Sequence, residues 1–300
     1  MNVLLAGGGG FLGRAVARIL SERGHGCIVT TRGLAEADHG IESILLDVSD
    51  AASVEALDLR SVDVVCNLAA RIHRPPEVQG SDWYFEVNTF GAERLAERCA
   101  SEPGLRLVDI STGNAYDPRE AHPTERSPLY PIHGAYGYLS SKVAGETLVQ
   151  GVARASGMPV TVLRPSSIYG PGMATSVMTA FIDRAVAGEP LHVADGGSHR
   201  ADFVHVDDVA TCVAEACEDE APGAWNVGSG HATSILELAH AVVETFGSRS
   251  PIYVEGDPDQ QPRGFAPLNI EAAQERWGLT PRRLEDGLVS LRESGRDAGC

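Results

Sequence analysis

The sequence lacks long hydrophobic runs, closely spaced cysteines and an excess of basic residues. No apolar run approaches the roughly 18 residues that would span a bilayer, and Met1 leads directly into a predicted strand, so we expect a cytoplasmic protein without a membrane anchor. The six cysteines show no C-x-x-C spacing, which predicts reduced packing residues and no metal site. With 24 Lys and Arg against 41 Asp and Glu, the net charge of −17 argues against nucleic acid or an anionic membrane as a partner.

A glycine-rich turn near the N-terminus is the clearest motif that is present. The apolar residues 3–6 lead into four glycines, and a helical apolar pattern follows. A turn between a strand and a helix presents free N–H groups that hold a pyrophosphate. The spacing leaves two variants open, because Gly7 or Gly8 can be the first glycine of the motif. The residues predicted to bind a dinucleotide here are Gly7, Gly10, Phe11, Leu12 and Gly13.

Strands and helices then alternate at intervals of about 30 residues. Segments typical of buried strands occupy residues 27–31, 44–47, 63–70 and 105–110. This order predicts an α/β fold with a doubly wound, parallel Rossmann sheet. We expect a dinucleotide-binding domain at residues 1–165, to which residues 201–227 return, and a smaller mixed α/β domain at residues 166–300 that binds the substrate as a lid.

The end of the second strand bears on the choice of cofactor. NAD-binding proteins usually place a carboxylate there, whereas this chain has Thr31 followed by Arg32, which favours the 2′-phosphate of NADP(H) over NAD(H). The ends of the next strands are expected to border the cofactor, because ligands collect at the carboxyl edge of such sheets. The residues concerned are Asp47, Val48, Leu68, Ala69 and Ala70, together with Asn88 in a predicted helix at residues 83–99.

A tyrosine and a lysine stand four residues apart at the start of another predicted helix. Tyr138 and Lys142 therefore share one helical face. A phenol has an ordinary pKa of about 10, and a neighbouring ammonium group favours the phenolate that exchanges protons with an alcohol or ketone. Thr112, after the fifth strand, would hydrogen-bond the same substrate oxygen. Tyr136 has no lysine four residues on.

In this order and spacing, the motifs resemble those of extended short-chain dehydrogenases/reductases, the family of nucleotide-sugar epimerases, dehydratases and 4-ketoreductases. They are Gly7-x-x-Gly10-x-x-Gly13, Asn67-Leu-Ala-Ala70, Ser111-Thr112 with Ala115-Tyr116, Tyr138-x-x-x-Lys142, Leu163-Arg-Pro165 with Ile168-Tyr-Gly-Pro-Gly172, Asp202-Phe-Val-His-Val-Asp-Asp208 and Asn226-Val-Gly-Ser-Gly230. The resemblance implies that Tyr138 is the acid/base, that Lys142 lowers its pKa and binds the nicotinamide ribose, and that Thr112 orients the reacting oxygen. It further implies a cofactor contact at Pro165 and a homodimer through the helices at 83–99 and 138–151.

Departures from the family pattern reduce the number of activities that fit the sequence. The 4,6-dehydratases of the family carry Asp-Glu after the residue in the place of Thr112, and Gly113-Asn114 cannot perform those proton transfers. Epimerases commonly have Asn in the place of Ser167 and Arg in the place of Ala201, so the diphosphate contacts differ. The residues expected to bind the substrate are Asn114, Ser167, Arg200 and Arg263.

These observations predict an NADPH-dependent reductase acting on the C4 ketone of a nucleotide-linked deoxysugar. An NAD-dependent C4 epimerase is the alternative, since it would use the same residues. A reductase of a non-sugar ketone stays open because the diphosphate contacts are altered. A dinucleotide sensor without turnover is disfavoured, because a sensor has no need of a tuned proton donor.

Overall fold

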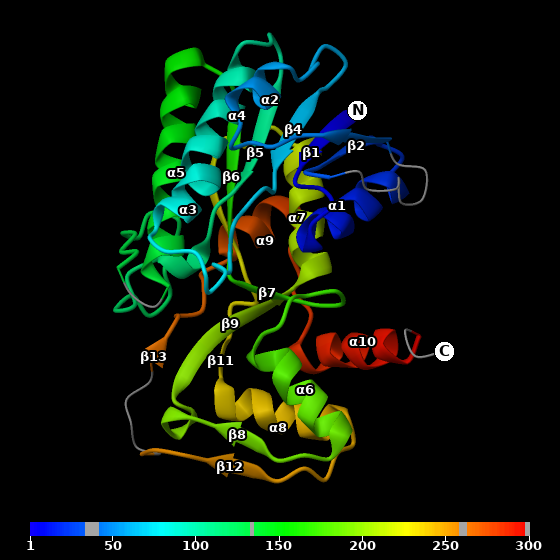
Figure 1. Ribbon diagram of the computed structural model, residues 1–300, viewed down its shortest axis with the longest axis vertical. Helices are drawn as coiled ribbons and strands as arrows, with labels where there is room; N and C mark the ends of the chain where they lie inside the picture. The colour runs from blue at the N-terminus through cyan, green and yellow to red at the C-terminus, as the bar shows by residue number, and fades with distance from the viewer. Residues whose placement is uncertain (34–41, 133–134, 258–262, 298–300) are drawn as a thin grey trace.

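A parallel seven-stranded sheet forms the larger part of the molecule, shown in a computed structural model that describes residues 1–33, 42–132, 135–257 and 263–297 (Figure 1). The strand order is β10-β6-β5-β4-β1-β2-β3. The strands are β1 (Asn2–Ala6), β2 (Gly26–Thr31), β3 (Glu42–Leu45), β4 (Val64–Asn67), β5 (Arg106–Ile110), β6 (Val160–Pro165) and β10 (Gly223–Val227). The predicted doubly wound Rossmann sheet is confirmed.

Helices cover both faces of this sheet. On one face, α1 (Phe11–Glu22) and α7 (Val206–Glu218) pack on Val3 and Leu5 of β1. On the other, α2 (Ala51–Glu55), α4 (Ala92–Ala100) and α5 (Tyr136–Ser156) pack on the side of Leu4 and Ala6. Successive side chains of a strand point to opposite faces, so two buried faces require the unbroken apolar run seen in the sequence.

The predicted helix at residues 83–99 contains an irregular segment. It consists of α3 (Asp82–Phe85), a π-helical segment (Glu86–Gly91) and α4. Asn88 lies in the π-helical segment, which packs so closely on α5 that a Cβ at Gly145 would lie 2.1 Å from the Asn88 carbonyl oxygen. This irregular turn sets the position of Asn88 relative to α5.

The smaller part of the molecule has its own sheets and core (Figure 1). One sheet contains β7 (Ser167–Tyr169), β9 (His199–His205), β11 (Ala232–Ser234) and β13 (Arg263–Gly264), and β8 (Leu191–Val193) pairs with β12 (Ile252–Val254). The helices α6 (Val177–Ala187), α8 (Ile235–Thr245) and α10 (Leu284–Asp297) pack around this core, while α9 (Glu271–Trp277) contacts β10. No helix among the described residues is both long enough and apolar enough to span a membrane.

Residues 201–227 divide between the two parts. Residues 223–227 form β10 and pair in parallel with β6 in the large sheet, and α7 packs against α1. The expectation that residues 201–227 return to the dinucleotide-binding domain does not hold for residues 203–205, which lie outside the large sheet. They belong to β9, which pairs with β7, β11 and β13, because the chain enters the large part only where α7 begins.

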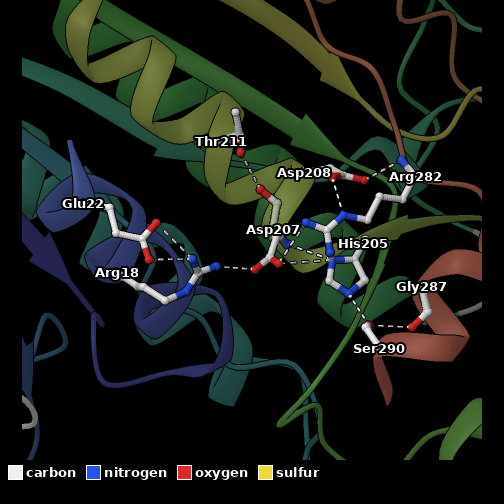
Figure 2. A network of polar contacts seen from close by, with 9 residues as sticks. All are labelled: Arg18, Glu22, His205, Asp207, Asp208, Thr211, Arg282, Gly287 and Ser290. Atoms are coloured by element: carbon white, nitrogen blue, oxygen red, sulfur yellow. Dashed lines mark hydrogen bonds and ion pairs between the residues drawn. The ribbon is translucent and has the colours of Figure 1, made fainter. Parts of the chain in front are cut away.

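The buried His205 connects α7 to the C-terminal segment through hydrogen bonds (Figure 2). His205 caps α7, with its Nδ1 atom accepting from the Asp207 N–H at 3.2 Å, and its Nε2 atom lies 3.1 Å from Ser290 Oγ of α10. Arg282 pairs with both Asp207 and Asp208, and Arg18 of α1 reaches Asp207 at 2.7 Å. The network therefore joins α1, α7 and α10.

We expect this joint to weaken in acid. Burial first, and then the Arg282 charge, lower the pKa of His205 to about 4, against about 6.5 for an unfolded histidine. The unfolded chain thus binds the proton more readily, so the contribution of His205 to stability is complete above about pH 6.5 and is lost as the pH falls toward 4. The loss is about 3 kcal/mol. The free energy of unfolding, measured with denaturant across this pH range, should depend more steeply on pH for the wild-type protein than for His205→Asn. The asparagine amide keeps an acceptor for the helix cap but does not titrate. Equal slopes for the two proteins would contradict the assignment.

Candidate active site

The glycine turn places backbone at the carboxyl edge of the large sheet. Gly7 has φ +82°, and a Cβ there would lie 2.9 Å from the backbone of Ala69. A Cβ at Gly13 would lie 2.4 Å from the Gly8 carbonyl oxygen, so Gly13 lets α1 approach the turn. The left-handed conformation of Gly7 favours the spacing Gly7-x-x-Gly10-x-x-Gly13 of the two that the sequence left open.

The N-terminus of α1 is built to receive an anion. Its N-cap is Gly10, no side chain caps it, and its first turn has no acidic residue. The Gly7 N–H donates to the buried Thr30 Oγ1 at 3.0 Å, which fixes the turn. Arg14 Nη1 donates to the Gly9 carbonyl at 2.8 Å and brings a positive charge to the same place. Sequence reasoning missed Arg14, although it directly follows Gly13.

A cavity of about 530 Å³ opens beside this turn. The predicted cofactor residues that line it are Gly7, Gly10, Thr31, Arg32, Asp47, Val48, Leu68, Ala69 and Ala70. The lining residues that sequence reasoning did not name are Gly9, Thr30, Gly33, Leu46, Arg71 and Val87. The volume, the uncapped helix and the crowded glycine backbone all fit a dinucleotide. Among the residues that the structure describes, no three His, Cys, Asp or Glu side chains are grouped as metal ligands.

The charged groups of this cavity lie at the ends of β2, β3 and β4. Hydrogen bonds from Ser49 lower the pKa of Asp47, and the charges of Arg32 and Arg71 add to the effect. Arg32 is exposed, whereas Arg71 is fixed, because its Nη1 donates to the Trp83 carbonyl at 2.7 Å and its guanidinium lies 5.0 Å from the Trp83 ring centre. Arg32 is therefore exposed and lines the cavity, whereas Arg71 is held in place.

Thr112 and Tyr138 lie side by side in the structure. Thr112 follows β5, is buried, and forms a hydrogen bond with Tyr138, which lies in the first turn of α5. Burial raises the pKa of Tyr138 to about 12, and within the described residues only the bond with Thr112 opposes this increase. The lowering expected from Lys142 is therefore not seen. The phenol is held in its protonated form and would ionise only beside further positive charge.

Lys142 is buried one helical turn after Tyr138. Its side chain is 4% exposed, and no hydrogen bond or ion pair to its ammonium group is found within the described residues. Burial lowers the pKa of Lys142, and the charges of Asp109 and Glu146 raise it.

Asn88 lies outside the cavity and connects two segments of the site through hydrogen bonds. Its Oδ1 accepts from the Arg71 N–H at 2.8 Å, and its Nδ2 donates to the Arg71 carbonyl and to Ser141 Oγ, both at 2.9 Å. Since Ser141 precedes Lys142, Asn88 fixes this turn of α5 against the end of β4. It does not line the cavity, and neither do Phe11, Leu12, Gly13, Tyr138, Lys142 or Pro165.

Comparison with known proteins agrees with this geometry. The model of the NAD dependent epimerase/dehydratase family matches residues 3–228. The chain belongs to this family. UDP-glucose 4-epimerase of Mycolicibacterium smegmatis is 30% identical over 83% of each chain. UDP-glucose 4-epimerase of Thermotoga maritima, solved with UDP-glucose, is 26% identical with a TM-score of 0.86 over all of both chains. That of Thermus thermophilus, solved with NAD, is 26% identical with a TM-score of 0.83 over 99% of this chain and 100% of its own.

Two of the predicted substrate residues of this epimerase/dehydratase family member lie near the end of β5. Asn114 Nδ2 donates to Ser167 Oγ at 3.3 Å, so two predicted substrate residues lie together beyond Thr112. Ser111 Oγ, also at the end of β5, is buried and has no partner among the residues described.

The two predicted arginines lie on opposite faces of the small sheet. Arg200 pairs in register with Ser234, whose hydrogen bonds lower the pKa of Glu237 in α8. The Arg200 charge adds to this effect, so Arg200 belongs to the helix side. Arg263 pairs with His199 and shares the face of Ala201, because strand side chains alternate. Of the two, Arg263 is therefore on the face where the family commonly carries its arginine.

Proposed function

We propose that the protein is a nucleotide-sugar C4 epimerase. The observation that carries this proposal is a site with one proton-transferring pair, Thr112 and Tyr138, followed by Gly113 and Asn114 where a dehydratase would need carboxyl groups. The named epimerases that it resembles over most of its length support the same activity. They also suggest UDP-glucose and UDP-galactose as first substrates to try.

In this mechanism the protein moves one proton and holds two ligands. Tyr138 takes the proton of the sugar C4 hydroxyl and later returns it to the same oxygen, with Thr112 fixing that oxygen through a hydrogen bond. A bound nicotinamide would supply reversible hydride transfer. The uncapped N-terminus of α1 and Arg14 would hold its pyrophosphate, and Lys142 its ribose. The cofactor must stay bound through the cycle, because an epimerase has no net redox change.

The proposal is tested by incubating the purified protein with UDP-glucose or UDP-galactose and following the anomeric proton signals by NMR. We expect both to reach the same equilibrium mixture without added cofactor, and denaturation to release NAD. The absence of interconversion with either sugar, and with their N-acetylamino counterparts, would exclude the proposal.

A 4-ketoreductase that uses NADPH is the second candidate, favoured by Arg32. This residue lines the cavity where an NAD enzyme usually has a carboxylate, and a guanidinium binds phosphate through paired hydrogen bonds. We expect Arg32→Ala to weaken NADPH binding about tenfold and NADH binding less than about twofold. Fluorescence titration of both reduced cofactors checks this. Equal losses would remove the basis for an NADP preference.

We also propose a homodimer formed through α4 and α5, as the family resemblance implies. These helices pack side by side on one flank of the molecule (Figure 1), and Phe90 on the adjoining π-helical segment is 42% exposed. Light scattering should give twice the chain mass, and Phe90→Glu should give a monomer. A monomeric wild-type protein at high concentration would refute this assembly.

A further inference from the structure

The carboxyl group of Asp202 in β9 accepts hydrogen bonds from several distant segments of the chain. Asp202 is fully buried, so its oxygens depend on protein donors in place of water. The donors are Ser166 Oγ at 3.1 Å, the N–H and Oγ of Ser229, both at 2.7 Å, the Gly230 N–H at 3.2 Å and the Leu268 N–H at 3.0 Å. One buried side chain therefore holds three separate segments of the chain.

Each of these segments is a crossing between the two parts of the molecule. Ser166 stands between β6 of the large sheet and β7 of the small sheet. Residues 229–230 lie between β10 and β11, and Leu268 lies between β13 and α9, which contacts β10. A Cβ at Gly228 would lie 2.6 Å from Asp202 Oδ2, so a glycine lets the second crossing approach this closely. Asp202 thus fixes the smaller part relative to the large sheet at three points.

The crossing at Leu268 reaches the end of β5. The Leu268 side chain lies against Gly113, since a Cβ at Gly113 would be 2.5 Å from Leu268 Cδ1. Gly113 directly follows Thr112, which forms the hydrogen bond with Tyr138. The bond from the Leu268 N–H to Asp202 therefore sets how residue 268 lies against the proton-transferring pair.

The crossing at Ser166 carries a predicted substrate residue. Ser166 is followed by Ser167 of the small sheet, whose Oγ accepts from Asn114 Nδ2 at 3.3 Å in the turn after β5. This bond joins the two parts on the predicted substrate side. The dinucleotide cavity, in contrast, is lined by residues within 7–87, which all precede the crossings. Loss of Asp202 should therefore shift the substrate side and leave the cofactor cavity in place.

We propose that Asp202 is a positioning residue that holds the substrate side of the smaller part against Thr112 and Tyr138. This rests on the proposed function in that a nucleotide sugar binds between the two parts. Among the residues described, Asp202 forms no hydrogen bond with either side chain, so it acts through the crossings at Ser166 and Leu268. The effect can be large, because a misplacement of about 1 Å can slow a reaction about a hundredfold.

Asp202→Asn tests this proposal with almost no change in size. The new amide group is a donor, so it would face N–H groups that need an acceptor. We expect the affinity for UDP-glucose, measured by calorimetry with NAD present, to fall about tenfold or more, and the affinity for NADH to stay within about twofold. Asp208→Asn is the matched control, because Asp208 is also a buried carboxyl but accepts from the Arg282 N–H at 2.8 Å, in the C-terminal segment. Both affinities should stay unchanged in this control.

Amide hydrogen exchange provides a second measurement, which needs no substrate. The N–H groups of Ser229, Gly230 and Leu268 should exchange about tenfold faster or more in Asp202→Asn, while the amides of β1 and β4 keep their wild-type rates. If Asp202→Asn does not fold, the double variant Ser166→Ala/Ser229→Ala removes only the two hydroxyl donors. It should speed exchange at the same three amides and weaken UDP-glucose binding about threefold.

The two measurements separate this proposal from the proposed function. Unchanged exchange at the three amides in the folded variant overturns the role of Asp202, as does unchanged binding of a UDP-glucose that the wild-type protein binds. Equal losses of UDP-glucose and NADH affinity also overturn it, because they indicate a general loss of folding, and so does an equal loss of UDP-glucose affinity in Asp208→Asn. If the wild-type protein binds no UDP-glucose, the proposed substrate is wrong, and the exchange rates still decide whether Asp202 fixes the crossings.

Discussion

Tyr138→Phe is expected to abolish epimerisation, with turnover reduced by about a thousandfold, while cofactor binding stays within about twofold. The change removes one hydroxyl group, which is the side-chain proton donor hydrogen-bonded to Thr112. Turnover is measured by the NMR assay, and cofactor binding by fluorescence titration. Tyr136→Phe is the matched control, since Tyr136 lies two residues away on α5 but is 63% exposed.

The buried position of Tyr138 makes this experiment informative about pH as well. Its pKa of about 12 means that the folded protein alone gives very little phenolate at neutral pH. Turnover should therefore increase with pH, because more of the Tyr138 phenol is then ionised. A positively charged ligand beside Tyr138 would stabilise the phenolate and weaken this pH dependence. If Tyr138→Phe keeps more than about a tenth of the activity, another group carries the proton and the mechanism is wrong.

The parts of the site that follow from local chain geometry could be predicted from sequence. A strand, a glycine turn and a helix form one continuous unit, so the positions of Gly7, Gly10 and Gly13 predict where a pyrophosphate would bind. Likewise, Tyr138 and Lys142 share a helical face whatever the rest of the chain does. The parallel sheet followed from the alternation of buried strands with helices.

The parts that depend on contacts between distant segments could not be predicted. Asn67 and Asp109 become partners only when β4 and β5 pair. The local sequence of neither strand indicates that the other is its neighbour. The fixed position of Arg71 depends on Trp83, and the π-helical segment depends on close packing against Gly145. The placement of residues 203–205 failed for the same reason, because strand pairing in a mixed small sheet has no local signal.

Electrostatic expectations depend on neighbours that a local sequence does not show. The sequence predicts that Lys142, together with a bound nicotinamide, lowers the pKa of Tyr138, whereas burial raises this pKa in the protein without ligands. A spacing of four residues predicts proximity, whereas a pKa depends on every charge and on burial. The roles of Lys142 must therefore be separated by experiment.

Lys142→Met should reduce turnover by about a hundredfold and weaken NAD binding by about tenfold. Methionine fills a similar volume without a charge, so the loss reports the ammonium group in a site where the side chain is 4% exposed. Arg154→Met provides the control, because Arg154 is an exposed cation on the same helix, and it should change neither quantity.

Lys142→Arg then distinguishes charge from shape. If charge alone were needed, arginine would restore activity, since its guanidinium is always protonated. We expect no restoration, because the planar guanidinium is larger than an ammonium group and the side chain at this position is only 4% exposed. Full activity in Lys142→Arg would mean that the site needs only a positive charge, and a chain with 23 arginines would then have no chemical reason for its one lysine.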